Sequence, residues 1–248
     1  MTVKEIYNYL NSLFPVSTAC DFDNPGLLVG DPELKVSNVL IALDCTLNTV
    51  KLAYENGCQL IITHHPVIFS PIKDAVAGSV VYELIRNNIS VISMHTNLDI
   101  ADGGVNDCLC SAIGLREISP VTASDGFLLR SGVISPISAK NFAESLKTKL
   151  NVNIRYVDGG KNIEKVLVCS GSGGEFVEET ISGGFDALVT SEIKHHQFLH
   201  AKDCGISVFD AGHFATEVVV IEPLKKILEN KFSGISFITD TESLIKYK

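Results

Sequence analysis

The chain has 248 residues, which allows one large or two small domains, and its 46% of hydrophobic residues can fill a sizeable core. Its net charge of −9, with no run of lysine or arginine, argues against a surface that follows nucleic-acid phosphates. No apolar segment approaches the roughly 20 residues that span a bilayer, and the N-terminus lacks a signal-peptide pattern. The seven cysteines are scattered along the chain. We therefore expect a cytoplasmic protein with reduced thiols and no membrane partner.

The first elements predict an alternation of helices and strands. Thr2-x-x-Glu5 is a capping box that opens a helix through about residue 13. The continuous apolar run 39–43 is typical of a strand that is buried on both faces. Thr46 is a suitable N-cap for the next helix, which Gly57 ends.

The following strand carries the stretch on which the functional prediction depends. Its apolar residues 60–62 lead into His64, His65 and Pro66. Adjacent side chains of a strand point to opposite faces, so two adjacent imidazoles can converge only where the strand has ended. Pro66 favours that turn, because it has no N–H and biases His65 toward an extended backbone. Open α/β sheets place their sites at such carboxyl ends, although a pair of surface histidines remains the alternative.

A similar arrangement follows. Residues 66–78 predict an exposed loop beside the histidines that can close over a ligand. The strand 89–94 then delivers the polar residues from His95 to Asp99. A helix over about 105–113 ends at Gly114.

The second half of the chain repeats the first. A shift of 127 brings Thr63 onto Thr190 and replaces the histidine pair by Ser191 and Glu192, and a shift of 117 brings 89–91 onto 206–208. Further elements with counterparts are a helix at about 138–150, a helix at about 216–230 and a strand near 235–238. We therefore predict an α/β protein with two related domains, residues 1–124 and 125–248. Each is expected to be a mainly parallel sheet with helices on both faces, with the metal site in the cleft between the two.

The histidines point to a metal. All seven fall into three short stretches that each follow an apolar strand. The i, i+4 spacing of His213 and Glu217 places both on one helix face, which alone also fits an ordinary surface pair. In combination, nitrogen and oxygen donors without a nearby cysteine suit Zn, Mn, Fe or Co better than Ca or Mg. Two carboxylates with three imidazoles suit two divalent ions per chain, so metal-assisted hydrolysis is the predicted reaction class. The predicted ligands are His64, His65, Asp99, His213 and Glu217.

Other polar residues have less specific roles. They can orient ligands or transfer protons, or they can make structural hydrogen bonds. Asp23, beside a Pro-Gly turn, is either turn chemistry or such an orienting group. The glycine-rich stretch 170–174 is either a plain connection or an anion-binding turn. The candidates for orientation or proton transfer are His95, Glu192, His195 and His196.

At these residues the sequence resembles a family of toroidal hexamers with a dinuclear metal centre, many of which are named GTP cyclohydrolase 1 type 2 homologs. The resemblance implies two like α/β domains, a trimer of dimers, and metal ligands at His64, His65, Asp99, His213 and Glu217. Some members carry an additional domain in the middle, for which this chain has no room. The matching motifs are Asp23-Asn24-Pro25-Gly26-Leu27-Leu28-Val29-Gly30, Ala42-Leu43-Asp44, Thr63-His64-His65-Pro66, His95-Thr96-Asn97-Leu98-Asp99, Gly103-Gly104-Val105-Asn106-Asp107, Glu192-Ile193-Lys194-His195-His196 and Gly212-His213-Phe214-Ala215-Thr216-Glu217.

The activity that the resemblance implies is the hydrolytic opening of the guanine ring of GTP with release of formate. A triphosphate needs cationic partners, and the sequence offers few near the site beyond Lys73 and Lys194. We therefore expect a dinuclear metal-dependent hydrolase that acts on a small nucleotide or purine-like molecule. The alternative is a non-enzymatic hexameric scaffold that binds metal or a protein partner.

Overall fold

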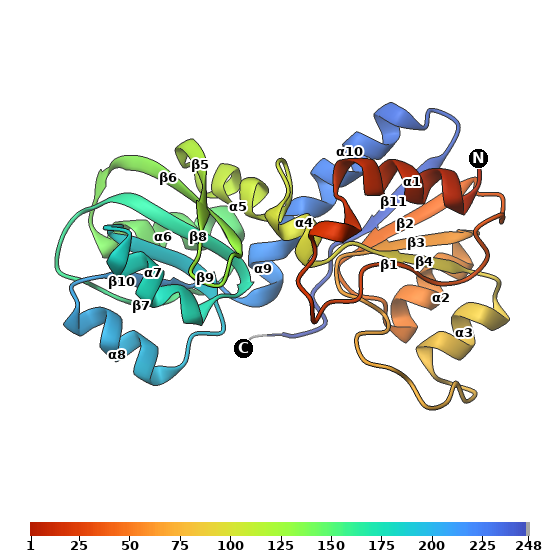
Figure 1. The fold of residues 1–248 in the computed structure, drawn as a ribbon, viewed down its shortest axis with the longest axis horizontal. Coiled ribbons are helices and arrows are strands. Elements are labelled where there is room, and N and C mark those ends of the chain that lie inside the picture. Colours follow the sequence, from red (N-terminus) through yellow and green to blue (C-terminus); the bar gives the residue numbers. More distant parts are fainter. Residues whose placement is uncertain (247–248) are drawn as a thin grey trace. The chain divides into compact units, whose positions relative to one another are not determined.

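The computed structural model describes residues 1–246 and groups them into two compact units. Unit 1 comprises Met1–Ala101 and the chain from Ile221 onward, and unit 2 comprises Asp102–Val220. Figure 1 follows the chain through both units by colour. Within the described residues, no helix combines the length and apolar character that crossing a membrane requires.

Unit 1 is built around a five-stranded sheet in the order β1-β4-β3-β2-β11. β1 is antiparallel to β4, and all other neighbours are parallel. In Figure 1, α1 and α10 cover one face of this sheet, while α2 and α3 cover the other. The elements of unit 1 are α1 (Val3–Leu13), η1 (Val16–Thr18), β1 (Gly26–Val29), β2 (Asn38–Ala42), α2 (Leu47–Glu55), β3 (Leu60–Thr63), α3 (Val80–Arg86), β4 (Ser90–Ser93), α4 (Thr96–Ile100), α10 (Ile221–Lys231) and β11 (Ser236–Asp240).

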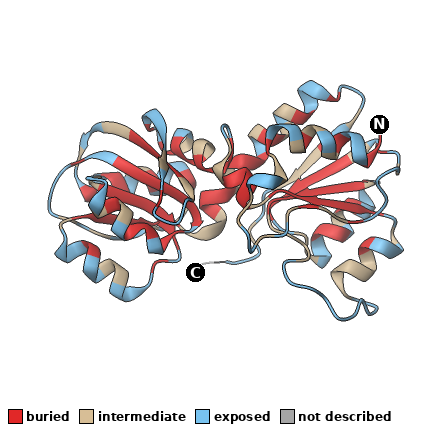
Figure 2. Cartoon of the chain, in the orientation of Figure 1, coloured by how far each residue is buried: buried red, intermediate tan, exposed pale blue. Residues whose placement is uncertain are grey.

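The helix caps of unit 1 confirm two predictions. At the start of α1, the Thr2 hydroxyl accepts from the amide of Glu5, whose carboxylate accepts from the amide of Thr2. At the start of α2, the Thr46 hydroxyl accepts from the Thr49 amide in the same way. β2 and β3, the strands before and after α2, are buried on both faces, which explains their continuous apolar sequence (Figure 2).

Unit 2 contains a six-stranded sheet in the order β5-β6-β8-β9-β10-β7. Only β8, β9 and β10 are parallel to one another. The pairs β5·β6, β6·β8 and β10·β7 are antiparallel. This sheet is therefore mixed, and the prediction of a mainly parallel sheet was wrong for unit 2. The elements of unit 2 are α5 (Val105–Ile113), β5 (Arg116–Thr122), β6 (Leu128–Ile137), α6 (Ala139–Leu150), β7 (Arg155–Val157), β8 (Ile163–Ser172), η2 (Gly174–Phe176), α7 (Val177–Ser182), β9 (Ala187–Ser191), α8 (His195–Asp203), β10 (Ser207–Asp210), α9 (His213–Glu217) and η3 (Val218–Val220).

The side chains of β8 show why helices cover both faces of the second sheet. Val166 and Val168 join one buried cluster, to which α5 and α6 contribute. Leu167 and Cys169 point the other way and join a second cluster with residues of α7 and α8. Alternate residues of a strand lie on opposite faces, so an uninterrupted apolar strand needs two such layers.

The internal repeat is confirmed at the centre of each sheet. In unit 1 the order β1-β4-β3-β2 has one antiparallel and two parallel pairings. In unit 2 the order β7-β10-β9-β8 has the same pairings in the same sequence. The strand that carries the histidine pair, β3, therefore corresponds to β9, as the shift of 127 predicted.

The predicted boundary between residues 124 and 125 does not match the division into units. It falls in the connection between β5 and β6, which pair with each other in the sheet of unit 2. The last strand, β11, returns to pair with β2 in unit 1. Each half of the repeat thus contributes its final helix and strand to the other unit, α5–β5 in one direction and α10–β11 in the other. A sequence shift identifies related segments but does not reveal which sheet a terminal strand joins.

The predicted helix over 216–230 is also divided. The structure has α9, then the short 3-10 turn η3, and then α10 from Ile221. Pro223 accounts for the break, because proline has no N–H and its ring clashes with the carbonyl four residues earlier in a continuous helix. In the first turn of α10 the missing N–H has no helical partner to lose.

The seven cysteines are free thiols with very different environments. Burial raises the pKa of Cys45 and of Cys110 to about 12, and that of Cys58 to about 11. Cys204 is exposed. We expect Ellman's reagent at pH 8 to label Cys204 rapidly in the native protein, the half-buried thiols of Cys20, Cys45 and Cys108 more slowly, and the buried thiols only after denaturation. Cys204→Ser should abolish the rapid phase, and a rapid phase that persists in this variant would contradict the assignment.

Candidate metal centre

The histidine pair lies where β3 ends. The first two amides beyond β3 still pair with the end of β2 and the residue after it. His64 N donates to Ala42 O at 3.3 Å, and His65 N donates to Leu43 O at 2.9 Å. The Thr63 hydroxyl donates to the carbonyl oxygen of His65 at 2.9 Å and so closes a tight turn. The two imidazole ring centres are consequently 5.0 Å apart, and the predicted convergence is confirmed.

A third imidazole stands beside the pair. The ring of His95, which follows β4, is centred 5.2 Å from that of His64 and 5.6 Å from that of His65. One nitrogen from each of the three rings lies within 4.8 Å of the others. We predicted that His95 orients ligands or transfers protons, and the structure brings it as close to the pair as the pair's members are to each other.

Each of these rings is held through its Nδ1 atom. His64 Nδ1 lies 2.9 Å from the carbonyl oxygen of Met94, and His65 Nδ1 lies 2.8 Å from Asp44 Oδ1. A carbonyl oxygen can only accept, so His64 carries a proton on Nδ1, and Nε2 is its candidate ligand atom. Metal-binding histidines in proteins are characteristically oriented in this way. We did not predict Asp44, although its position at the end of the neighbouring parallel strand is a signal that could have identified it.

The corresponding partner of His95 is Asp23, whose carboxylate lies 2.8 Å from His95 Nδ1. The same carboxylate accepts from the amide and the hydroxyl of Thr96 at 3.0 and 2.5 Å. Burial raises the pKa of Asp23, but the hydrogen bonds from His95 and Thr96 outweigh it and lower this pKa to about 2. Of the two interpretations of Asp23, the structure favours the orienting group over plain turn chemistry.

Asp99 provides a carboxylate next to the histidines. It lies on α4, only 8% of its surface is exposed, and its Oδ1 atom is 3.5 Å from His64 Nε2. The short helix α4 begins directly after His95, because the amides of Leu98 and Asp99 both donate to the His95 carbonyl oxygen. Unit 1 thus presents three imidazoles and a buried carboxylate in one place.

Unit 2 presents the second part of the predicted ligand set. His213 and Glu217 occupy the two ends of α9, and His213 Nε2 lies 3.0 Å from Glu217 Oε1. The predicted common helix face is therefore confirmed. His213 Nδ1 lies 3.0 Å from Glu192 Oε1, so this ring too has a carboxylate at Nδ1. Glu192 directly follows β9 and adopts a left-handed backbone with φ +56°.

The glycine-rich stretch has a packing role at this place. Gly171 has φ +60°, and a Cβ atom added there would collide with Glu217 Oε1. Its amide donates to the Thr216 hydroxyl at 3.0 Å, which ties the stretch to α9. Of the two interpretations of residues 170–174, this geometry supports a close connection that leaves space for the Glu217 carboxylate.

We expect Gly171→Ala to weaken metal binding by about 10-fold or more, because the new methyl group must displace the Glu217 carboxylate. The matched control is Gly184→Ala, at φ +68° with no atom near the added Cβ, which introduces the backbone strain alone. Both variants should lose about 1 kcal/mol of stability in urea titrations. Equal metal affinities of the two variants, measured by competition with a chelator, would show that Glu217 is not displaced.

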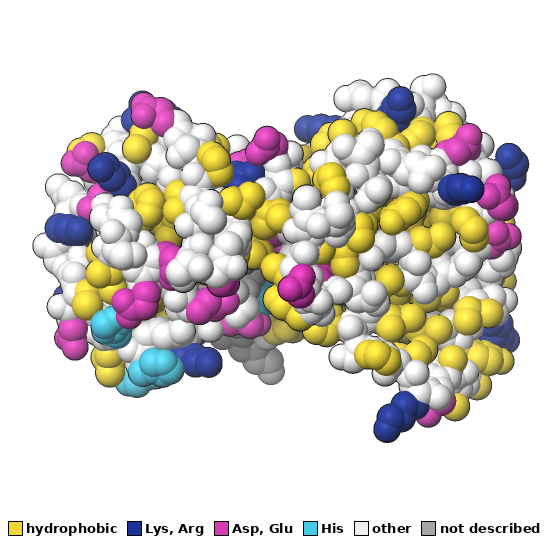
Figure 3. All heavy atoms as spheres, in the orientation of Figure 1, with side chains coloured by type: hydrophobic (Ala, Val, Ile, Leu, Met, Phe, Trp, Pro, Cys, Tyr) yellow, Lys and Arg dark blue, Asp and Glu magenta, His cyan; other side chains and the backbone are white. Residues whose placement is uncertain are grey.

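Two predicted residues of unit 2 form no hydrogen bond or ion pair with His213 or Glu217. His195 and His196 begin α8, where both are exposed, and neither side chain makes a hydrogen bond to another described residue. On the face in Figure 3, histidine side chains gather at the edge of the unit that contains α8. His200, to which we assigned no role, pairs with Glu178 on this surface at 2.7 Å.

The donor set of each unit fits a divalent metal ion. The carboxylates of Asp99 and Glu217 are 8% and 3% exposed, and an ionised carboxylate at such a position requires a cationic or hydrogen-bonding partner. Imidazole nitrogens with carboxylate oxygens suit Zn, Mn, Fe or Co. That one centre combines His64, His65 and Asp99 with His213 and Glu217 stays a prediction.

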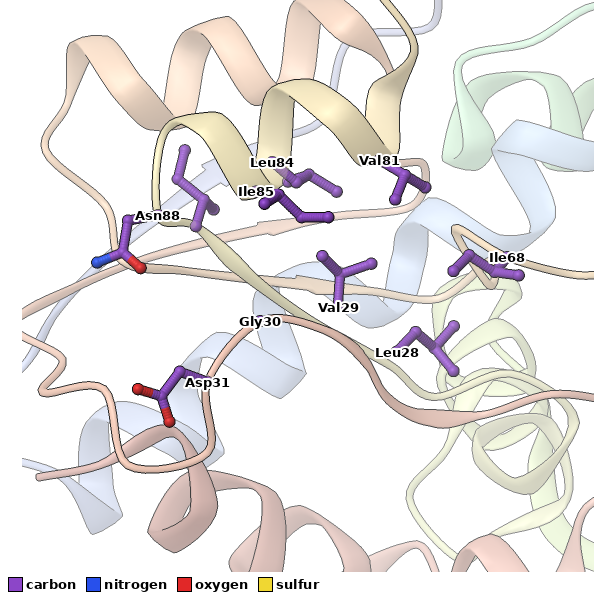
Figure 4. A pocket seen from close by; sticks show the side chains of 10 residues that line it. Leu28, Val29, Gly30, Asp31, Ile68, Val81, Leu84, Ile85 and Asn88 are labelled. Atoms are coloured by element: carbon purple, nitrogen blue, oxygen red, sulfur yellow. The ribbon is translucent and has the colours of Figure 1, made fainter. Parts of the chain in front are cut away.

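A separate pocket of about 420 Å³ opens in unit 1 between β1 and α3 (Figure 4). Its wall is mainly aliphatic, with polar side chains only at Asp31 and Asn88. None of the candidate metal ligands lines it, so its chemistry is distinct from that of the histidine cluster.

Comparison with known proteins gives consistent results. A family model described as Duf34/NIF3 (NGG1p interacting factor 3) matches residues 1–243. The chain is 34% identical over 241 residues to the GTP cyclohydrolase 1 type 2 homolog of Clostridium acetobutylicum, covering 92% of this chain and 90% of that protein. A Campylobacter jejuni protein of the same name is 36% identical over 236 residues, with 93% of each chain covered.

Solved structures share the whole fold. A hypothetical protein of Staphylococcus aureus superposes with a TM-score of 0.93 at 29% identity, covering 100% of this chain and 99% of the other. Reduced HcgD from Methanocaldococcus jannaschii superposes with a TM-score of 0.84 at 30% identity, covering 96% and 97%. These similarities confirm the predicted α/β architecture of two sheets with helices on both sides.

Proposed function

The chain belongs to the Duf34/NIF3 family, and on this premise we propose that it binds two divalent metal ions per subunit and uses them in a hydrolytic reaction. The observation that supports this most directly is the cluster of His64, His65 and His95, each held through Nδ1 by an oxygen atom. Four such restraints, counting His213, fix the ring orientations in advance of binding. The proposed ligands are His64, His65, Asp99, His213 and Glu217, with Zn, Fe, Mn or Co as the ion.

Divalent ions of this class supply Lewis-acid activation of a polar bond and of the water that attacks it. The residues of the chain provide orientation and proton transfer. His95, with its Nδ1 held by Asp23, is the candidate for moving a proton, because the carboxylate fixes the tautomer and stabilises the charged imidazole. Glu192 holds His213 in the same way.

The substrate that we propose is a small nucleotide or purine-like molecule. The curated relatives are named GTP cyclohydrolase 1 type 2 homologs, and the corresponding reaction on GTP would open the guanine ring and release formate. By the same resemblance we propose a hexamer built as a trimer of dimers, which light scattering would detect as six times the mass of one chain.

The test is an assay of the metal-loaded protein against GTP and a panel of nucleotides, with formate, phosphate and fluorescent products followed separately. His65→Ala serves as the control, because it removes one proposed ligand at the strand end. We expect turnover by the wild type to exceed that of the control by 100-fold or more. Such a ratio corresponds to about 3 kcal/mol of transition-state stabilisation. Equal rates in the two proteins would refute the hydrolase.

A non-enzymatic role is the second candidate, and the charge distribution favours it. The chain carries −9 overall, and on the face in Figure 3 its lysine and arginine side chains are scattered and form no continuous basic patch. Such a surface offers little to a triphosphate. Exchangeable metal with a specific bound protein and no turnover would support a scaffold, whereas two tightly held ions with turnover would support the enzyme.

A further inference from the structure

Two phenylalanine rings stand exposed beside the histidine cluster. Phe22 is 68% exposed and Phe69 is 50% exposed, and their ring centres are 6.4 Å apart at an interplanar angle of 51°. The Phe69 ring also meets the His95 ring edge to face, with centres 6.1 Å apart at 85°. Two large apolar rings in contact with each other and with a candidate catalytic histidine differ from a single exposed apolar residue, which is common on protein surfaces.

Both rings are carried by segments that the site itself holds in place. Phe22 directly precedes Asp23, whose carboxylate bonds to His95 and Thr96. Phe69 follows Ile68, whose carbonyl oxygen accepts from the Asn24 side chain at 2.6 Å. The two segments are therefore joined to each other and to the histidine cluster, so the position of the ring pair is coupled to that of His95.

The chemistry of the pair suits a flat ring. Aromatic side chains at a binding site stack on nucleobases, and this interaction depends on the π-face more than on hydrogen-bonding groups. Because the two rings are inclined at 51°, a flat ring would stack on one of them and contact the edge of the other. Such a ring would lie near His95, which contacts Phe69, and so near the proposed reaction centre. The exposed carboxylate of Asp21, which directly precedes Phe22, disfavours an anion at this position and leaves the neutral base as the better match.

We propose that Phe22 and Phe69 form an aromatic platform that binds the planar heteroaromatic ring, such as a purine base, of the substrate. This inference rests on the proposed function, because it gives the substrate of that same site. Two partly exposed phenylalanine rings offer about 250 Å², which is ample for one base but far below the roughly 800 Å² per partner of a stable protein interface. The area of the two rings alone therefore matches a small planar ring, and the contact of Phe69 with His95 places that ring beside the proposed reaction centre.

The test measures binding of two probes to the metal-loaded protein by isothermal titration calorimetry. Guanosine presents a base without phosphate, and ribose 5-phosphate presents phosphate without a base. We expect Phe22→Ala and Phe69→Ala each to weaken guanosine binding by about 5- to 150-fold and to leave ribose 5-phosphate binding unchanged. Phe69→Tyr, which keeps the π-face, should retain guanosine binding within about threefold.

The matched control is Ile72→Ala, because Ile72 lies on the same loop and has the same 50% exposure as Phe69 without a ring. It should leave both affinities unchanged. Metal content and melting temperature of every variant verify that the site and the fold are intact. Unchanged guanosine affinity in Phe22→Ala and Phe69→Ala, or no guanosine binding to the wild type, would overturn the platform.

The outcomes separate this inference from the proposed function. Guanosine binding that requires both rings, without turnover of any nucleotide, would support the platform and refute the hydrolase. Turnover of GTP that is unaffected by loss of both rings would refute the platform alone. A change in the mass of the assembly for Phe69→Ala and Ile72→Ala alike, with intact guanosine binding, would assign the surface to a contact between copies and overturn the platform.

Discussion

Replacing Asp99 or Glu217 by alanine is expected to remove at least one of two bound metal ions and to lower the affinity for the other by about 100-fold or more. Both carboxylates are almost fully buried against an imidazole nitrogen, at 3.5 Å from His64 and 3.0 Å from His213. Such a position provides strong metal binding when both partners are present. The measurement is metal content per chain after dialysis against a graded series of chelator concentrations.

The controls for these variants are acidic residues with exposed side chains, Asp74→Ala in unit 1 and Glu175→Ala in unit 2. They change the net charge equally but lie on the protein surface. If Asp99→Ala and Glu217→Ala keep as much metal as their controls, the ligand assignment is wrong. If only one of the two loses metal, the ions do not share both carboxylates, and the prediction of one dinuclear centre fails.

Asp23→Asn is expected to destabilise the metal-free protein by about 2 kcal/mol at pH 7, because the hydrogen bonds to His95 and Thr96 lower the pKa of Asp23 from 3.8 to about 2. A carboxyl group whose pKa is lower in the folded than in the unfolded protein stabilises the fold fully when the pH is above its unfolded-state pKa. This stabilisation is lost as the pH falls to the folded-state pKa. The difference between wild type and variant should therefore be constant above about pH 4 and shrink between about pH 4 and pH 2.

Urea titrations over this pH range, in the presence of chelator, measure the effect. Asp21→Asn is the control, because Asp21 is two residues away and exposed. A wild-type to Asp23→Asn difference that stays constant down to pH 2 would show that Asp23 carries no depressed pKa in the folded protein. The same variant should also lower turnover if His95 transfers a proton, whereas Asp21→Asn should not.

The strands that precede the candidate ligands could be predicted from the sequence, and the reason is physical. A strand buried on both faces must be continuously apolar, so the polar side chains that follow it are conspicuous. His64, His65 and Asp99 were found in this way, and the spacing of His213 and Glu217 predicted their common helix face. The internal repeat then related β3 to β9 correctly.

The residues that hold the imidazole rings were harder to predict. Acidic residues beside turns are common for local reasons, so the sequence left two interpretations of Asp23 open, and its contact with His95 favours the orienting group. Asp44 was missed although it closely follows a buried strand, as the histidine pair does. His195 and His196 begin an exposed helix, and adjacent histidines at such a helix start resemble those at a strand end when only the sequence is known. The mixed sheet of unit 2 was missed because β5 is an exposed edge strand without an apolar pattern.

The exchange of terminal elements has a consequence for synthesis on the ribosome. The sheet of unit 1 gains its last strand, β11, only when the chain has been made as far as Asp240. The elements of unit 2 all lie within Asp102–Val220, so they emerge complete before it. The order of completion is therefore the reverse of the order of the sequence. Until β11 arrives, β2 is the edge strand of the unit 1 sheet in the nascent chain, and an unpaired apolar edge of this kind can pair with another copy.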